Sequence, residues 1–262
     1  EKTGDYFNNF HTEGKDYAEW NKTLWDSAVE ESSLIQNLKW RAGYLKKYLS
    51  SFTVYHFHDT SVSSPMRGDC NINDNEYLRD NGSNLAAFLY SMMQNDETNF
   101  RLIEGVVSSI APYFKCFKLR PDVNDKERIR LEWEEKETDM YLNGYSFSDG
   151  TLRFIALATL LLQSKTPEVI VIDEPELGLH PAAINKFAEL VKRASNKSQI
   201  ILSTQSTNLV NCFDVKDIIV VDRIESQSVF RHLSEEDLAT WMDEYDLSIS
   251  DLWEKNMIGG QL

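Results

Sequence analysis

The hydrophobic pattern of the chain changes near residue 140. Before that point the sequence is polar, charged and mostly helical in pattern. Signals for a short strand near 52–57, helices over 84–93 and 102–114, and an edge strand over 128–133 follow one another there. An amphipathic helix precedes them, predicted from apolar residues at three- and four-residue steps: Leu34, Leu38, Ala42, Leu45 and Leu49.

Beyond residue 140 the pattern alternates between helices and buried strands. Residues 151–163 are apolar nearly all round, which predicts a buried helix. Residues 168–173 form a continuous β-branched run, as expected of a strand covered on both faces. A helix marked by Ile184, Phe187, Ala188 and Val191 follows, then buried strands at 199–203 and 217–222 and an edge strand at 228–232. This order predicts an α/β fold with a parallel sheet.

These patterns divide the chain into three parts. Residues 1–140 form a mainly helical insertion region, residues 141–233 form the α/β part, and residues 234–262 form a helical tail. With 42% hydrophobic and 26% charged residues, the chain has enough apolar material for a sizeable core. The most apolar run, 154–162, is far shorter than the ~20 residues of a membrane span, so no membrane association is expected.

Charge and cysteine content limit the partners and the compartment. The chain carries 27 basic and 42 acidic side chains, a net charge of −15. This balance argues against a surface that broadly attracts nucleic acid, because neutralising phosphates requires clustered Lys and Arg. DNA binding would need a local basic strip, which net charge does not exclude. Cys70, Cys116 and Cys212 lack the spacing of a disulfide framework or a metal knuckle, which predicts a reduced, cytoplasmic compartment.

Two adjacent acids end the predicted strand over 168–173. Asp173 closes the β-branched run and Glu174 follows it. Ligands of open parallel sheets bind beyond the carboxyl ends of the strands. A carboxylate there can hold Mg²⁺ through its water shell, and the next acid can polarise a water aimed at a γ-phosphate. The alternative is that the acidic pair only ends a strand and begins a turn.

Two further polar segments accompany this acidic strand end. Ser148 or Asp149 can cap the buried helix, whose free backbone N–H groups then form an anion site. The segment 203–206 ends the next buried strand, so its side chains should emerge beside Asp173 and Glu174. An ordinary helix cap and a hydrophilic loop are the alternatives. The fixed order of the three segments favours a single nucleotide site over coincidence.

At this point the sequence resembles the RecF/SMC/OLD-type branch of ABC ATPases, in particular the stand-alone predicted ATPases of the bacterial AAA/ABC-like group. FSDGTLRF at 147–154 is similar to the ABC signature, VIVIDEPELGLHP at 169–181 to Walker B with the D-loop, and STQS at 203–206 to the switch segment. YHFHDTS at 55–61, DNGSNLAAFL at 80–89 and LWEKNMIGG at 252–260 are similar to other phrases of the family. The resemblance implies an ABC-type P-loop NTPase core.

The resemblance also implies a set of roles and two cofactors, ATP and Mg²⁺. Asp173 would organise the magnesium ion, and Glu174 would be the general base. Ser148 would contact the γ-phosphate held by the opposite protomer, where Gly150 would let the backbone approach. Gln205 stands where many ABC ATPases place a histidine that senses the γ-phosphate.

Leu179 and His180 would lie in the D-loop, which crosses the dimer interface. A head-to-tail homodimer is therefore expected, because the signature acts only on a nucleotide bound by another protomer.

Three features depart from the family pattern. Asp149 makes the signature SDG rather than SGG, which places an acid near the partner's nucleotide. Gln205 can hydrogen-bond a phosphate but cannot become cationic as histidine can. The phosphate loop G-x-x-x-x-G-K-[ST] is missing, since the single Gly-Lys pair, Gly14-Lys15, lacks the rest of the motif. We expect the complete protein to carry that loop N-terminal to Glu1.

The histidines suggest a separate metal hypothesis. His56 and His58 share a face if their segment is a strand, and Asp59 follows them. Imidazole suits zinc or iron. The alternative is a pair of hydrogen-bonded structural histidines near the nucleotide cleft. His232, on the predicted edge strand, is expected at the surface.

Two classes of function follow. The first is ATP binding and hydrolysis by a dimerising engine that acts in DNA repair or anti-phage defence with an effector such as a nuclease. Too few residues follow the edge strand for a fused TOPRIM nuclease, so the effector is expected to be a separate chain. The second is a non-hydrolysing ABC-like scaffold or interaction module. The acids Asp173 and Glu174 favour the first, and the missing phosphate loop favours the second.

Overall fold

The computed structural model describes residues 52–138, 140–234, 238, 247–255 and 257–259. The chain divides into two units, Glu1–Phe52 and Thr53–Leu262, and the features below belong to the second, apart from Phe52 at the start of the first described strand. The helix predicted between Leu34 and Leu49 and the Gly14-Lys15 pair lie outside the described residues. None of the described helices is long and apolar enough to cross a membrane.

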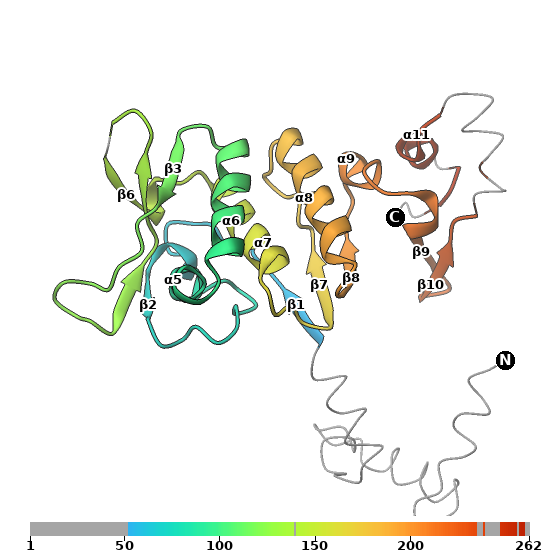
Figure 1. Ribbon diagram of the computed structural model, residues 1–262. Coiled ribbons are helices and arrows are strands. Elements are labelled where there is room, and N and C mark those ends of the chain that lie inside the picture. Colours follow the sequence, from blue (N-terminus) through green and yellow to red (C-terminus); the bar gives the residue numbers. More distant parts are fainter. Residues whose placement is uncertain (1–51, 139, 235–237, 239–246, 256, 260–262) are drawn as a thin grey trace, which may run out of the picture. The chain divides into compact units, whose positions relative to one another are not determined.

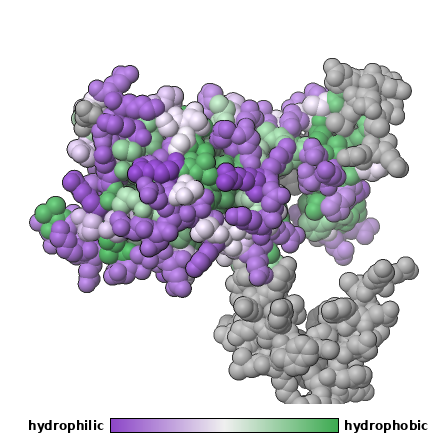
Figure 2. Space-filling view, viewed as in Figure 1, coloured by the Kyte–Doolittle hydropathy of each residue, from purple (hydrophilic) through white to green (hydrophobic). Residues whose placement is uncertain are grey.

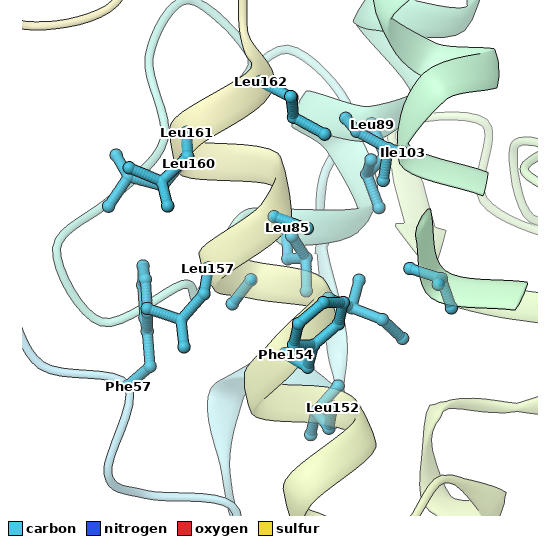
Figure 3. Packing of buried hydrophobic residues seen from close by; sticks show 14 of the residues in the cluster. Phe57, Leu85, Leu89, Ile103, Leu152, Phe154, Leu157, Leu160, Leu161 and Leu162 are labelled. Carbon is cyan, nitrogen blue, oxygen red and sulfur yellow. The ribbon is translucent and has the colours of Figure 1, made fainter. Parts of the chain in front are cut away.

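A helix without a polar face forms the centre of the described part. Helix α7 (Asp149–Leu162) is buried at every position from Thr151 to Leu162, as its apolar sequence predicts. It packs against α6 (Glu97–Ile110) and α8 (Pro181–Ala194), and α5 (Leu85–Asn95) packs against α6. Figure 3 shows side chains that meet α7 from the segment after the first strand, from α5 and from α6: Phe57, Leu85, Leu89 and Ile103.

A three-stranded sheet holds the end of the predicted catalytic strand. Its order is β1 (Phe52–Tyr55), β7 (Val169–Asp173) and β8 (Gln199–Ser203), with β7 in the middle (Figure 1). Strands β7 and β8 are parallel, and Asp173 lies opposite Ser203. Helix α8 connects them, since parallel neighbours need a crossover connection. The prediction of an α/β fold with a parallel sheet is confirmed.

The strand predicted over 217–222 does not join this sheet. It is β9 (Ile219–Ile224), which pairs antiparallel with β10 (Gln227–His232) as a separate hairpin. Glu225 and Ser226 between them have φ values of 48° and 67°, the left-handed conformations that tight hairpin turns require. The sequence carries no Asn-Gly or Asp-Gly signal there, so the hairpin was missed. His232 is exposed, as predicted.

The hairpin exposes apolar side chains. Val220 is buried in β9, whereas Val221 is 47% and Phe230 70% exposed. Most of the face in Figure 2 is hydrophilic, and hydrophobic colour gathers over the region of this hairpin. Val220 belongs to a small second core completed by α9 (Thr207–Val210), η3 (Val215–Asp217) and α11 (Ile249–Glu254). Helix α11 is the helical part of the predicted tail that the structure describes.

The described residues before 144 are mixed rather than mainly helical. Strands β2 (Asp69–Asn71) and β4 (Arg128–Arg130) form one antiparallel pair, and β3 (Phe114–Phe117), β5 (Glu132–Glu135) and β6 (Tyr141–Asn143) form another small sheet. The edge strand predicted over 128–133 is therefore two strands in different sheets. Strands of three or four residues are too short to show a clear alternation in the sequence.

Strand β5 connects the small sheet to the start of α7. Trp133 stacks on Phe147, with ring centroids 4.6 Å apart. Its neighbour Glu134 is ion-paired with Lys115 and, at 2.6 Å, with Lys118. These two lysines hold the pKa of the Glu134 carboxyl at about 2, and Lys115 has the larger effect. The small sheet β3-β5-β6 thus packs against the segment that leads into α7.

Candidate functional site

The acidic end of β7 is held by groups from both neighbouring strands. The Asp173 carboxylate accepts a hydrogen bond from the Ser203 hydroxyl at the end of β8. The backbone carbonyl of Asp173 accepts one from Nε2 of His58, which follows β1, at 2.7 Å. Asp173 and His58 are half-buried. Ser203, the first residue of the polar segment at 203–206, therefore lies beside the acids, as the sequence predicts.

Glu174 occupies a strained turn. Its φ of 41° lies in the left-handed region, which is unusual for a residue with a side chain and is found often at functional sites. The backbone N–H of Glu174 donates to the carbonyl of Ser203 at 2.9 Å, which fixes the chain as it leaves the strand. The turn thus places the second acid just outside the sheet edge that carries Asp173.

Glu176 is a member of the site that the sequence interpretation missed. Its side chain is buried, and Oε1 accepts a hydrogen bond from the Thr204 hydroxyl at 2.5 Å. Burial raises the pKa of Glu174, and the charge of Glu176 and a hydrogen bond between the two carboxyls raise it further. Oε2 of Glu176 is buried without a hydrogen-bond partner among the described residues. The available signal was a third acid within four residues.

The predicted signature turn is built by a cap and an ion pair. Ser148 caps α7, since its hydroxyl accepts the Thr151 N–H at 3.2 Å. Asp149 points instead to Arg67, with 2.7 Å between Oδ1 and Nη2. Arg67 is the buried last residue of the short helix η1 (Pro65–Arg67). Its guanidinium also donates to the carbonyls of Thr60, Gly144 and Phe147. The acid that departs from the SGG pattern is therefore tied to a buried arginine of the same chain.

Gly150 is required by a close approach within the chain. A Cβ at this position would lie 2.4 Å from the carbonyl oxygen of Gly178, which itself has a φ of 74°. The start of α7 thus contacts the segment that follows Asp173 and Glu174. Arg153, one turn into α7, donates to the carbonyls of Phe57 at 2.9 Å and His58 at 2.8 Å. Helix α7 therefore positions both the end of β1 and the segment after β7.

The other predicted site residues lie on separate elements. His180 caps α8, with Nδ1 accepting the Ala182 N–H at 3.2 Å. Gln205 is exposed in the loop between β8 and α9, directly before the α9 cap Ser206. Leu179 is half-buried against the main core. The structure places these residues without showing a ligand role for them.

The structure replaces Asp59 with Asp173 as the third residue of the predicted metal site. Asp59 does not belong to the group of ligands, and its Oδ1 accepts the N–H of Ser61 at 3.1 Å and the Ser61 hydroxyl at 2.7 Å. One nitrogen each from His56 and His58 and a carboxylate oxygen of Asp173 lie within 4.8 Å of one another. The sequence could not reveal this group, because Asp173 follows His58 at a separation of 115 residues.

The donors at the strand ends fit a hydrated magnesium ion. Asp173 offers a carboxylate and Ser203 a hydroxyl, at the carboxyl ends of two parallel strands. Mg²⁺ takes one or two such oxygen ligands and keeps several waters. The half-buried position of Asp173 leaves space for those waters. The arrangement can hold a cation beside a carboxyl of raised pKa.

A family model matches residues 30–211, more than half of the chain. It is described as "AAA domain, putative AbiEii toxin, Type IV TA system". The chain therefore belongs to this AAA-domain family. The matches support the resemblance to RecF/SMC/OLD-like ABC-type ATPases.

Individual relatives match over short stretches. The Old nuclease of Escherichia phage P2 is 31% identical over 111 residues, which cover 38% of this chain and 19% of the relative. ABC transporter A family member 11 of Dictyostelium discoideum is 30% identical over 111 residues, 38% of this chain and 13% of the relative. The chain thus spans less than a fifth of these two proteins. A solved structure of an SMC ATPase, from work on ATP-driven dimerization and DNA-stimulated activation, is 20% identical, with a TM-score of 0.44, and covers 61% of this chain and 98% of that one.

Proposed function

We propose that the chain is part of a Mg²⁺-dependent ATPase in which Asp173 organises the metal and Glu174 acts as the general base. The observation that carries the proposal is the paired acids at the carboxyl end of β7, held between β1 and β8. Bound Mg²⁺ would neutralise charge on the ATP phosphates. The family match supports nucleotide chemistry for this fold.

The chain's own groups can carry out the proton steps. The Ser203 hydroxyl orients the Asp173 carboxylate by donating to Oδ1. Glu174 accepts a proton from the attacking water, and its raised pKa makes it a better acceptor than an exposed glutamate. Glu176, buried against Thr204, keeps the pKa of Glu174 raised through its like charge. Product release then requires that Glu174 return the proton to solvent.

The phosphate-binding groups must come from outside these motifs, since the 262 residues contain no G-x-x-x-x-G-K-[ST]. Among the described strands, β8 is at one edge of the sheet. No described strand pairs with its outer edge, and Ile201 there is 45% exposed. Exposed apolar edges are normally covered in a complete fold. We propose that a strand carrying the phosphate loop completes the sheet at this edge.

Dimerisation is the second part of the proposal. Ser148 and Gly150 at the start of α7 would contact the nucleotide of a second protomer, with Leu179 and His180 near the shared surface. A separate effector such as a nuclease, in DNA repair or anti-phage defence, would respond to that dimer. The P2 Old nuclease among the relatives motivates this role. Sedimentation of the Glu174→Gln chain with ATP tests it, and monomer alone would contradict the dimer.

Turnover of ATP with Mg²⁺ tests the chemistry. Glu174→Gln should abolish turnover, because the amide cannot accept the proton of water. Glu168→Gln is the matched control, since Glu168 is exposed just before the opposite end of β7. Equal loss in both variants, or full activity in Glu174→Gln, would contradict the assignment of the base.

A non-hydrolysing scaffold is the second candidate, favoured by the missing phosphate loop. It predicts no turnover even by the complete protein with its phosphate loop, and no effect of Glu174→Gln on partner binding. Measuring ATP binding alongside turnover separates the two functions.

A further inference from the structure

The two histidines after β1 form a compact group with the end of β7. The rings of His56 and His58 lie edge to face, with centroids 5.9 Å apart. One nitrogen of each ring and one carboxylate oxygen of Asp173 lie within 4.8 Å of one another. It is the sole group of three such ligands within the described ranges of the chain. Three donors of two kinds therefore converge at one edge of the sheet.

Hydrogen bonds hold the backbone of both histidines and the carboxylate of Asp173. Arg153 of the buried helix α7 donates to the carbonyl of His58 at 2.8 Å. The N–H of His56 donates to the carbonyl of Asp80 at 2.9 Å. The Ser203 hydroxyl holds the Asp173 carboxylate. Groups that are already held near one another lose less conformational entropy when they bind an ion.

The hydrogen bond of His58 selects its ligand nitrogen. Nε2 can bond the Asp173 carbonyl, at 2.7 Å, only as a donor, so the proton of the neutral ring is on Nε2. Nδ1 then carries the lone pair that a metal requires. Metal-binding histidines usually donate their other ring N–H to a carbonyl or carboxylate in this way. A metal on Nδ1 would therefore be held by a ring that this hydrogen bond orients.

We propose that His56, His58 and Asp173 form a binding site for a zinc-class divalent ion. Two imidazoles and one carboxylate with an open fourth position are a ligand set of zinc enzymes. Imidazole favours zinc over magnesium, which prefers oxygen ligands. Bonds of about 2.0–2.1 Å in a tetrahedral site separate ligands by roughly 3.3 Å. The outer limit of the group, 4.8 Å, is longer than this separation, so binding an ion would draw the donors closer together.

The site has a consequence for the proposed ATPase, on which this part of the inference rests. Asp173 belongs to both ion sites, so a zinc ion on the histidines competes with magnesium for the same carboxylate. Zinc should therefore lower Mg²⁺-dependent turnover of the unaltered chain, and it should lower turnover less in His56→Gln. The zinc ion would thus inhibit turnover by occupying the carboxylate that magnesium needs.

Titration calorimetry of the metal-free chain with ZnCl₂, without nucleotide, tests the site directly. His56→Gln removes one ligand and leaves the backbone bond to Asp80 in place. We expect it to weaken zinc binding by at least about 10-fold, the lower end of the loss seen when even an outer partner of a metal site is removed. Asp173→Asn should weaken binding likewise. His232→Gln, an exposed histidine of β10, is the matched control and should bind as the unaltered chain does.

Two outcomes would overturn the site. One is no zinc binding by the unaltered chain, which would leave His56 and His58 as structural residues. The other is equal affinity in the unaltered chain, His56→Gln and His232→Gln, which would show surface binding only. Zinc binding that depends on His56, together with no ATP turnover by the complete protein that carries the phosphate loop, would retain the site and refute the ATPase, so the two proposals fail separately.

Discussion

The contact between Gly150 and Gly178 allows a quantitative test of how the signature turn is packed. An alanine at 150 would place its Cβ 2.4 Å from the Gly178 carbonyl oxygen, whereas real Cβ contacts essentially never fall under 3.0 Å. The two backbones must therefore separate by at least about 0.6 Å. Neither partner is a flexible side chain, so the strain spreads into α7 and the turn after β7.

Overpacking of a well-packed site destabilises by about 1–3 kcal/mol. The loss of glycine's freedom in the unfolded chain offsets roughly 0.4–1 kcal/mol of this. We expect Gly150→Ala to lower the free energy of unfolding by about 1–2 kcal/mol. The control is Gly105→Ala in the exposed middle of α6, where an added Cβ meets nothing within 4 Å. It should raise the stability by about 0.4–1 kcal/mol.

Urea unfolding of both variants measures these changes, with the slope m used to confirm that the same surface is exposed. The midpoint should move to lower urea in Gly150→Ala and to higher urea in Gly105→Ala. A Gly150→Ala chain as stable as the unaltered protein would refute the close approach. In that case the only role of Gly150 would be to let a phosphate approach the backbone.

Three further predictions concern charges. Arg67→Leu removes the guanidinium hydrogen bonds to three carbonyls and should destabilise the fold by at least about 3 kcal/mol. Asp149→Asn should cost about 1 kcal/mol or less, because that side chain is 70% exposed. Denaturant unfolding compares the two variants. The pKa of Glu134 is lowered from 4.5 to about 2, so its ion pairs stabilise the fold above pH 4.5 and are lost as the pH falls toward 2. The free energy of unfolding of the unaltered chain should therefore fall more over that pH range than that of Glu134→Gln. Finally, Glu176→Gln removes a like charge and should lower the pKa of Glu174, so the acidic limb of ATP turnover moves to lower pH; a limb that stays in place would contradict the coupling.

The sequence by itself determined the elements whose signal is local. The apolar run of α7, the β-branched run of β7 and the polar ends of β7 and β8 all depend on residues within a few positions of one another. The cap at Ser148 is of the same kind, since its partner Thr151 is three residues away. The hydrophobic period and helix capping depend on residues within one or two turns of chain, so both can be predicted without the tertiary structure.

Tertiary structure alone decided which of these elements meet. His58 reaches Asp173 across 115 residues, and Arg67 reaches Asp149 across 82. The need for glycine at 150 likewise follows from its approach to Gly178, which no local pattern encodes. Such contacts depend on strand order and helix packing rather than on periodicity. The physical reason is that a hydrogen bond or ion pair between distant residues forms only once the core has closed and fixed both partners in space.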